Sequence, residues 1–139
     1  MATIVLTNAF VLLNSVDLSD HVKSVTLNYE ADMQDNTAMS MSTKSNLPGL
    51  KNWDISIDFL QDYAAAKVEA TMFPLVGAAA FPFELRGSAA AVSVTNPKYT
   101  GTGLLQSFAP IAGGVGDVQM APVKIVPGGA SNTLTRATA

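Results

Sequence analysis

The chain has 139 residues, enough for one domain with its own hydrophobic core, and its 14% of charged residues is well below the roughly 25% of ordinary soluble domains. So few charges predict that much of the surface faces other protein, the alternative being a monomer of low charge. The net charge of −3 argues against binding of nucleic-acid phosphates, and the absence of cysteine excludes disulfides and thiolate metal sites.

The N-terminal segment is predicted to begin with a strand. "MATIVLTNAFVLLN" is apolar but has no basic start, and Thr7 and Asn8 interrupt it, which is typical of a strand and not of a signal peptide. "FVLLNSVDLSDHV" indicates a strand ending in a turn, with Asn14 and Asp17 as turn formers. The longest apolar run, "MFPLVGAAAFPF", contains two prolines and is too short to span a bilayer. We therefore expect no membrane association.

Two segments, "VKSVTLNYE" and "KNWDISIDF", alternate strictly between apolar and polar residues. A period of two is that of a half-buried β-strand, so the apolar faces are predicted to pack on a core. The opposite faces carry only polar and acidic side chains, and the alternation alone leaves open whether they face water or a partner. These polar-face residues are Ser24, Thr26, Asn28, Glu30, Asn52, Asp54, Ser56 and Asp58.

Between these two strands lies a polar segment, residues 31–50, "ADMQDNTAMSMSTKSNLPGL". It is predicted to be a long inter-strand loop, and loops beyond roughly 12–15 residues are uncommon unless they are functional or disordered. Met33, Met39 and Met41 are flexible apolar side chains suited to contacts that adapt to a neighbouring surface. We expect this loop to be only marginally ordered in the isolated subunit.

The second half of the chain predicts one helix and several short strands. Asp62 is suited to cap a helix over 62–73, with Ala64, Val68 and Met72 on one face and Pro74 ending it. The segments "FPFELRG", "AAVSVTN", "KYTGTGLLQSF" and "DVQMAPVKIVP" are short, β-branched or alternating, and bounded by Gly, Pro or Asn. Together they predict a mainly β fold, a β-sandwich or barrel with one flanking helix. The tail, residues 128–139, is expected to be mobile in isolation.

No arrangement of residues supports catalysis, and we expect no enzyme activity, cofactor or metal site. His21 is the only histidine, and one histidine without cysteine leaves little room for a nucleophilic triad or a metal site. Asp54 and Asp58 stand roughly 13 Å apart at about 3.3 Å per residue. That separation exceeds the roughly 5–9.5 Å of glycosidase carboxylate pairs. The "GTG" at 101–103 lacks the remainder of a dinucleotide fingerprint.

In the order of its segments, the chain resembles the major tail proteins (tail tube proteins) of long-tailed bacteriophages. The resemblance rests on "FVLLNSVDLSDHVKSVTLNYEAD", on the loop closed by "LPGLKNWDISIDF", on "DYAAAKVEATMFPLVG", and above all on "YTGTGLLQSFAPIAGGVGDVQMAPVKIVPGG". It implies one tail-tube domain over residues 1–139, without the C-terminal immunoglobulin-like domain of some relatives. That domain is a β-sandwich with a flanking helix that forms hexameric rings stacked into a tube.

The resemblance also implies a function, a location and partners. The chain would be a structural virion protein of the tail, made in the host cytoplasm, that assembles with itself and with tape-measure, terminator and tip proteins. DNA would pass through the lumen without specific binding. The polar-face residues would line that lumen, and Met33, Met39 and Met41 would belong to a loop that contacts the next ring.

Two other interpretations remain open at this point. Within phage biology, the chain could form a tail-tip or adaptor ring, or the inner tube of a contractile or phage-derived particle. From another class, a soluble carbohydrate-binding β-sandwich would require an exposed aromatic platform. Trp53 and most of the three Tyr and six Phe fall instead on apolar strand faces.

Overall fold

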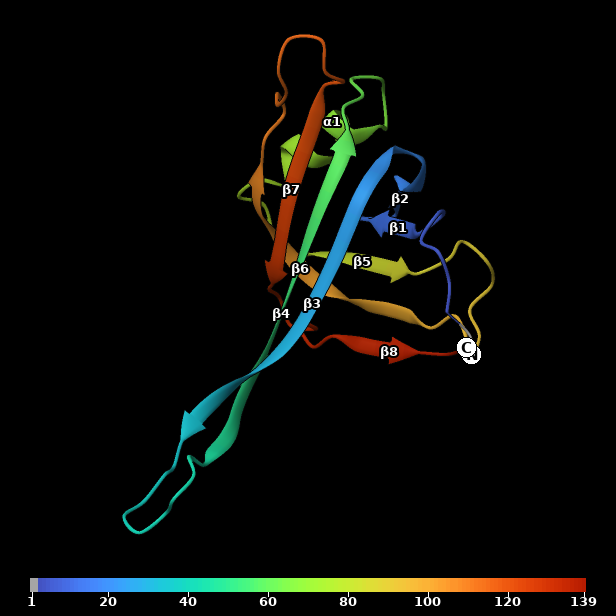
Figure 1. Ribbon diagram of the computed structural model, residues 1–139. Coiled ribbons are helices and arrows are strands. Elements are labelled where there is room, and N and C mark those ends of the chain that lie inside the picture. The colour runs from blue at the N-terminus through green and yellow to red at the C-terminus, as the bar shows by residue number, and fades with distance from the viewer. Residues whose placement is uncertain (1–2) are drawn as a thin grey trace.

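The computed structural model describes residues 3–139 and is mainly β (Figure 1). The strands form one antiparallel sheet in the order β2-β1-β5-β6-β7-β4-β3, with β8 paired to β6. None of the described helices is long and apolar enough to cross a membrane. The elements are β1 (Phe10–Leu13), β2 (Val16–Asp17), η1 (Ser19–His21), β3 (Val22–Asp35), β4 (Asn46–Leu60), α1 (Val68–Met72), η2 (Phe73–Leu75), β5 (Phe81–Arg86), β6 (Lys98–Phe108), β7 (Met120–Pro127) and β8 (Thr135–Ala137).

Strand β6 runs through both layers of the sandwich, so that a single hydrogen-bonded sheet folds into two layers. Residues 98–103 pair with β5, whereas residues 103–108 pair with β7, so the halves of β6 belong to different layers (Figure 1). The halves meet at Gly103, where a Cβ atom would lie 2.8 Å from Ile125 Cγ2 and 3.0 Å from the Trp53 ring. Only glycine allows so close an approach without displacing these neighbours. The β-sandwich predicted from the sequence is confirmed, with its two layers joined through β6.

The core lies between these layers. Trp53, Ile55, Ile57 and Phe59 of β4 are all at most 3% exposed, as their alternation predicted. They pack with inward residues of β1, β5 and β7, and the Trp53 and Phe83 rings are 4.9 Å apart between centroids. The apolar face of β3 is less well covered than we expected. Its Tyr29 is 49% exposed, because β3 continues past the edge of the opposite layer.

Half of the segment predicted as a loop over 31–50 is strand. β3 and β4 pair as far as Asp35 and Asn46, so the connecting loop covers only residues 36–45. The paired extensions project from the core as a two-stranded ribbon, residues 31–50, hereafter the ribbon (Figure 1). The Asn36 N–H donates to Ser45 O at 3.0 Å, and this bond closes the loop at the end of the ribbon. The sequence concealed these strands because neither face of the ribbon is buried, so no apolar alternation is required.

The predicted helix is shorter than expected. It begins at Val68 and not at Asp62, because Ala66 adopts a left-handed backbone conformation with φ of 60°. Asp62 caps no helix; its Oδ1 accepts from Ala64 N at 2.9 Å in a local turn. Val68 and Met72 are buried as predicted, whereas Ala64 is exposed.

The two ends of the chain also differ from the prediction. The N-terminal strand begins only at Phe10: residues 3–9 are irregular, and residues 1–2 lie outside the described part. The tail, expected to be mobile, contains β8, which pairs with residues 98–100 of β6. The Trp53 Nε1–H donates to Asn132 O at 2.7 Å and fastens the start of this tail to the core.

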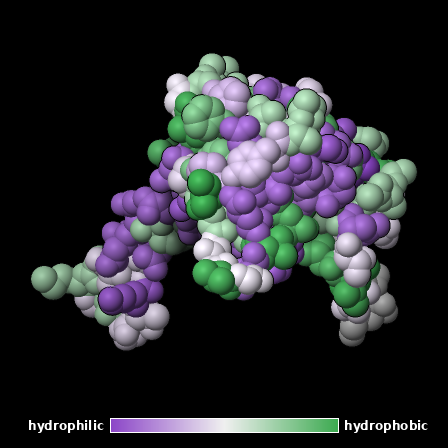
Figure 2. Space-filling view, turned by 90° about the horizontal axis from the view of Figure 1, so that it is seen from above, coloured by the Kyte–Doolittle hydropathy of each residue, from purple (hydrophilic) through white to green (hydrophobic). Residues whose placement is uncertain are grey.

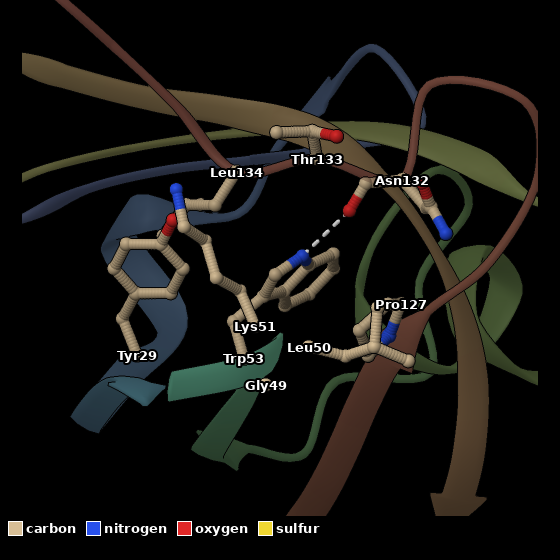
Figure 3. A pocket seen from close by; sticks show the side chains of 9 residues that line it. All are labelled: Tyr29, Gly49, Leu50, Lys51, Trp53, Pro127, Asn132, Thr133 and Leu134. Atoms are coloured by element: carbon tan, nitrogen blue, oxygen red, sulfur yellow. Dashed lines mark hydrogen bonds between the residues drawn. The ribbon is translucent and has the colours of Figure 1, made fainter. Parts of the chain in front are cut away.

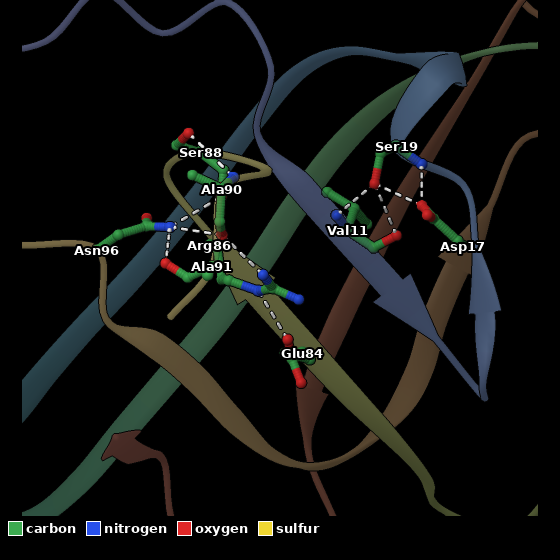
Figure 4. A network of polar contacts seen from close by, with 9 residues as sticks. All are labelled: Val11, Asp17, Ser19, Glu84, Arg86, Ser88, Ala90, Ala91 and Asn96. Carbon is green, nitrogen blue, oxygen red and sulfur yellow. Dashed lines mark hydrogen bonds and ion pairs between the residues drawn. The ribbon is translucent and has the colours of Figure 1, made fainter. Parts of the chain in front are cut away.

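Residues 90–96, predicted as a strand, instead belong to the loop between β5 and β6. The Asn96 side-chain amide donates to three carbonyls of this loop, and Arg86 donates to Ala90 O at 2.9 Å (Figure 4). Arg86 also pairs with Glu84 at 2.8 Å and lies 4.0 Å from the centre of the Phe10 ring. Residues 90–96 are therefore held by hydrogen bonds from the Asn96 and Arg86 side chains and not by pairing with a neighbouring strand.

Candidate functional site

The eight predicted polar-face residues are brought together on one side of the sheet. The register of β3 and β4 sets Ser24 opposite Asp58, Thr26 opposite Ser56, Asn28 opposite Asp54, and Glu30 opposite Asn52. Asp54 is partly buried and the other seven side chains are exposed, on the side away from the core. Ser24 Oγ donates to Asp58 Oδ2 at 3.0 Å. We call this surface the polar face.

Strand β7 adds a cation to the polar face that sequence reasoning missed. Lys124 is the register partner of Ser56, and its Nζ lies 3.8 Å from Asp54 Oδ2. Such a partly exposed pair contributes at most about 1 kcal/mol to stability, so its main effect is on the local charge. The alternation in "PVKIV" signals that Lys124 points outward. The alternation does not reveal that β4, which carries Asp54, is the strand beside Lys124.

The polar face ends at a long unpaired strand edge. β3 is the last strand in the sheet order, and in the part of the chain that the structure describes no strand pairs with its outer edge. An edge of 14 residues offers its free N–H and C=O groups to a further strand. The other end of the order, β2, has only two residues. The β3 edge is therefore the principal place for strand addition.

The ribbon carries the three predicted methionines on its surface. Met39 is 96% exposed, and more than half of the Met33 and Met41 side chains is exposed too. Leu47 and Leu50 of the same ribbon are likewise open to solvent. From above, the middle of the molecule is covered mostly by hydrophilic side chains, with hydrophobic ones scattered around it (Figure 2). The structure thus places the methionines on an exposed, projecting segment, and Met33 lies within β3.

His21, the single histidine of the chain, lies between two carboxylates and forms an ion pair with each when it is protonated. Its Nδ1 lies 2.7 Å from Asp20 Oδ1 and its Nε2 lies 2.8 Å from Asp62 Oδ2. Burial lowers the pKa of His21, but the hydrogen bonds to the two carboxylates outweigh burial and raise it above its ordinary value. Within residues 3–139, no three acidic or histidine side chains are grouped so that they could hold a metal ion. The pair with Asp62 therefore connects η1 with the segment before α1.

A pocket of about 470 Å³ opens where the ribbon leaves the core (Figure 3). We call it the basal pocket. Sequence reasoning did not find it, because its walls come from three separate segments that only the fold brings together. Its lining residues are Tyr29, Gly49, Leu50, Lys51, Trp53, Pro127, Asn132, Thr133 and Leu134.

The sequence matches no protein-family model and no curated protein. Solved structures are similar in fold. A chain of the virion of a native gene transfer agent particle aligns over 94% of this chain and 95% of its own, with a TM-score of 0.71 and 12% identity. A chain of the tail of an empty gene transfer agent particle, computed with C6 symmetry, covers 86% of this chain and 83% of its own, with a TM-score of 0.64 and 15% identity.

A chain of the sheath/tube terminator of an extracellular contractile injection system is similar as well. It aligns over 98% of this chain and 97% of its own, with a TM-score of 0.72 and 9% identity. At such identities the similarity concerns the fold. The mainly β, tail-tube-like fold expected from the sequence is thereby confirmed, and it is a fold found in phage-like tails and injection systems.

Proposed function

We propose that this chain is a structural virion protein whose copies form rings, and that the rings stack into the tube of a phage tail or phage-derived particle. The observation that carries the proposal is the combination of the polar face with the unpaired β3 edge. Strand addition along that edge joins the polar faces of neighbouring copies into one surface. The fold shared with chains of tail particles supports this reading.

The number of subunits per ring is proposed to be six. The supporting observation is the C6 symmetry of the gene transfer agent tail, which contains a chain of the same fold. Closing a sheet into a barrel removes the free edges that otherwise cause uncontrolled aggregation. A ring in which every β3 edge pairs with the next subunit satisfies the backbone groups of all copies at once.

The polar face is proposed to line the lumen through which DNA passes. Symmetric assembly would repeat Glu30, Asp54 and Asp58 around the channel, and carboxylates repel phosphates. Lys124 offsets part of that charge beside Asp54. A water-filled channel screens the remaining repulsion between like charges over a Debye length of roughly 8 Å. The wall would then let DNA slide without binding it.

The ribbon is proposed to lie against a subunit of the next ring. Its exposed methionines are suited to a surface that must tolerate small differences between neighbours. Tape-measure, terminator and tip proteins are the further partners that a tube of this kind requires. The chain then acts in the virion tail and performs no catalysis.

The carbohydrate-binding interpretation has little support in the geometry. Trp53 is 3% exposed, and Phe81 and Phe83 are buried in the core. Tyr29, Tyr63 and Phe73 are exposed, and the only pair of neighbouring aromatic rings within residues 3–139 is Trp53 with Phe83, in the core. A tail-tip or adaptor ring built from this fold would differ from a tube in its assembly, because it would end after one ring.

The test is the assembly state of the purified chain. We expect rings or tubes by negative-stain microscopy, and a mass that rises with concentration by size-exclusion chromatography with light scattering. Single rings that never stack would favour the adaptor interpretation. A chain that stays monomeric at millimolar concentration, with neither rings nor tubes on the grid, would contradict the proposal.

A further inference from the structure

The loop between β6 and β7, residues 109–119, exposes three hydrophobic side chains. Val115 is fully exposed, Ile111 is 77% exposed and Val118 is 65% exposed. Exposed apolar side chains gathered on one segment indicate a contact surface. We call this segment the apical loop, because it lies at the end of the sheet opposite the ribbon (Figure 1).

The apical loop is held in a defined turn. Asp117 N–H donates to Gly114 O at 3.1 Å, and Gly114 N–H donates to the Asp117 carboxylate at 3.2 Å. Gly113 and Gly116 have positive φ values of 140° and 86°, which glycine adopts without steric cost. Val115 is thus presented at the tip of a preformed turn. Little ordering entropy is then lost when this turn meets a partner.

The basal pocket offers a matching surface. Five of its lining residues are apolar or aromatic and one, Lys51, is cationic (Figure 3). The polar end of Trp53 is already bonded to Asn132 O, so its ring presents an apolar wall. The volume of about 470 Å³ is larger than one valine side chain and has room for the tip of a loop that carries one, and the apolar wall suits the chemistry of that side chain. The five apolar or aromatic residues are Tyr29, Leu50, Trp53, Pro127 and Leu134.

The loop and the pocket lie at the two ends of one strand. Met120, the first residue of β7, follows the apical loop, and Pro127, the last, lines the basal pocket. Seven steps along the strand at about 3.3 Å each separate these two residues by roughly 23 Å. A subunit therefore cannot fill its own pocket. A second copy displaced along β7 can, and such a head-to-tail contact repeats without closing.

Charge supports the same pairing. Lys51 lines the pocket and Asp117 belongs to the loop, and within residues 3–139 neither takes part in an ion pair. Opposite charges at the rim of a contact orient the partners more than they add affinity. Every copy carries one apical loop and one basal pocket, so each pocket can be filled by the loop of one other copy.

We propose that the apical loop of one copy inserts into the basal pocket of the next copy along the tube, with Val115 inside the pocket and Asp117 beside Lys51. The inference rests on the proposed function, because stacked rings bring these two ends together. A neighbour seated in this way lies beside the ribbon, which then runs along its surface. Stacking would have two contacts per subunit, the ribbon and the apical loop.

The absence of cysteine makes a crosslinking test direct. The double variant V115C/L50C places one thiol at the loop tip and one at the pocket, both at exposed positions where the fold does not depend on the native side chain. The protein is oxidised, and a parallel sample is treated with a short bismaleimide. We expect a ladder of covalent dimers, trimers and longer chains on a denaturing gel. A mixture of the two single variants should stop at dimers.

The matched control is V115C/V94C, in which the second thiol replaces an exposed valine outside the pocket. An equal ladder from this control would overturn the proposed contact. Tubes on the grid without a ladder from V115C/L50C would also overturn it and leave the tube function standing. Neither tubes nor ladder would reject both proposals, whereas a ladder without tubes would support the contact and reject the tube.

A charge exchange provides a second measurement of the same contact. K51D should cause loss of pelletable tubes, because two carboxylates then face each other at the pocket rim while the apical loop keeps its turn. D117K should lose tubes too, but it also removes the carboxylate that accepts from Gly114 N–H, so the double variant K51D/D117K should restore only part of the tubes. Tubes of D117K that equal those of the unaltered chain would overturn the assignment of this pair.

Discussion

At the scale of single residues, Gly103 decides how closely the two layers approach. A Cβ atom there would lie 2.8 Å from both Ile125 Cγ2 and Val126 O. We expect Gly103→Ala to destabilise the fold by about 1–3 kcal/mol, the usual cost of overpacking a core. Urea denaturation measures this free energy of unfolding.

Gly87→Ala is the matched control for this change. The nearest atom to a Cβ at Gly87 is Ile4 Cδ1 at 3.8 Å, an ordinary contact, so its effect should stay within about 0.5 kcal/mol. Equal stabilities of the two variants would show that the layers adjust freely at Gly103.

His21 predicts a dependence of stability on pH. Its pKa is raised in the folded chain, so its stabilising contribution is complete below its ordinary value of 6.5 and is lost as pH rises through the raised pKa. The pKa values of Asp20 and Asp62 are lowered, so their contribution is present above 3.8 and is lost as pH falls through the lowered values. The ion pairs therefore stabilise the fold most between these two limits.

The measurement is the melting temperature between about pH 6 and 9 for the unaltered chain and for His21→Gln. We expect the unaltered chain to lose its advantage over the variant as the imidazolium deprotonates. Asp20→Asn, which leaves the Asp62 partner in place, should show a smaller slope. Parallel profiles for the unaltered chain and His21→Gln would mean that the two ion pairs add nothing to stability.

At the scale of elements, the ribbon is separable from the core. The buried side chains of β4 begin at Trp53, so the ribbon contributes little to the packing between the layers. We expect deletion of residues 34–44 to abolish tube growth and to leave the circular dichroism spectrum of a folded β-protein. The deletion joins Met33 to Ser45, near the cross-strand pair of Met33 with Pro48, so the shortened hairpin can still close.

The readouts for the deletion are negative-stain microscopy for tubes and circular dichroism for the fold. Replacing Met33, Met39 and Met41 by Gln in the full-length ribbon separates the methionine contacts from the length of the ribbon. Unimpaired tube growth of the deletion variant would reject the role proposed for the ribbon in stacking.

At the scale of the whole molecule, the charge of the polar face decides how DNA would meet the wall. We expect the double change of Asp54 and Asp58 to Lys to slow or stop DNA release from assembled particles. Each added cation releases counterions from the phosphates and favours binding. Asp17→Lys, at an exposed acid away from this face, is the control; it makes the same kind of substitution with half the change in charge, and it also removes the Asp17 hydrogen bonds with Ser19.

The assay is DNA ejection from particles that carry these variants, after microscopy has established that the tubes still form. Unchanged ejection in the double variant would mean that the polar face does not line the channel. A defect as large in the Asp17→Lys particles would trace the effect to total charge and not to this face.

Much of the fold follows from local patterns in the sequence. The alternation in "KNWDISIDF" predicted which side chains of β4 enter the core, and β6 spans the residues of "KYTGTGLLQSF". The eight residues of the polar face were also identified from alternation alone. Alternation is readable because burying one side of a strand imposes a period of two on neighbouring residues.

The tertiary structure decided what depends on contacts distant in the chain. The strands of the ribbon bury neither face, so they carry no pattern, and the helix begins at Val68 because Ala66 turns the backbone to positive φ. Lys124 beside Asp54 and His21 beside Asp62 join residues more than 40 positions apart. The basal pocket joins three segments of the chain that lie apart in the sequence. Periodicity assigns a side chain to a face, but only the strand order and register determine which other side chains share that face.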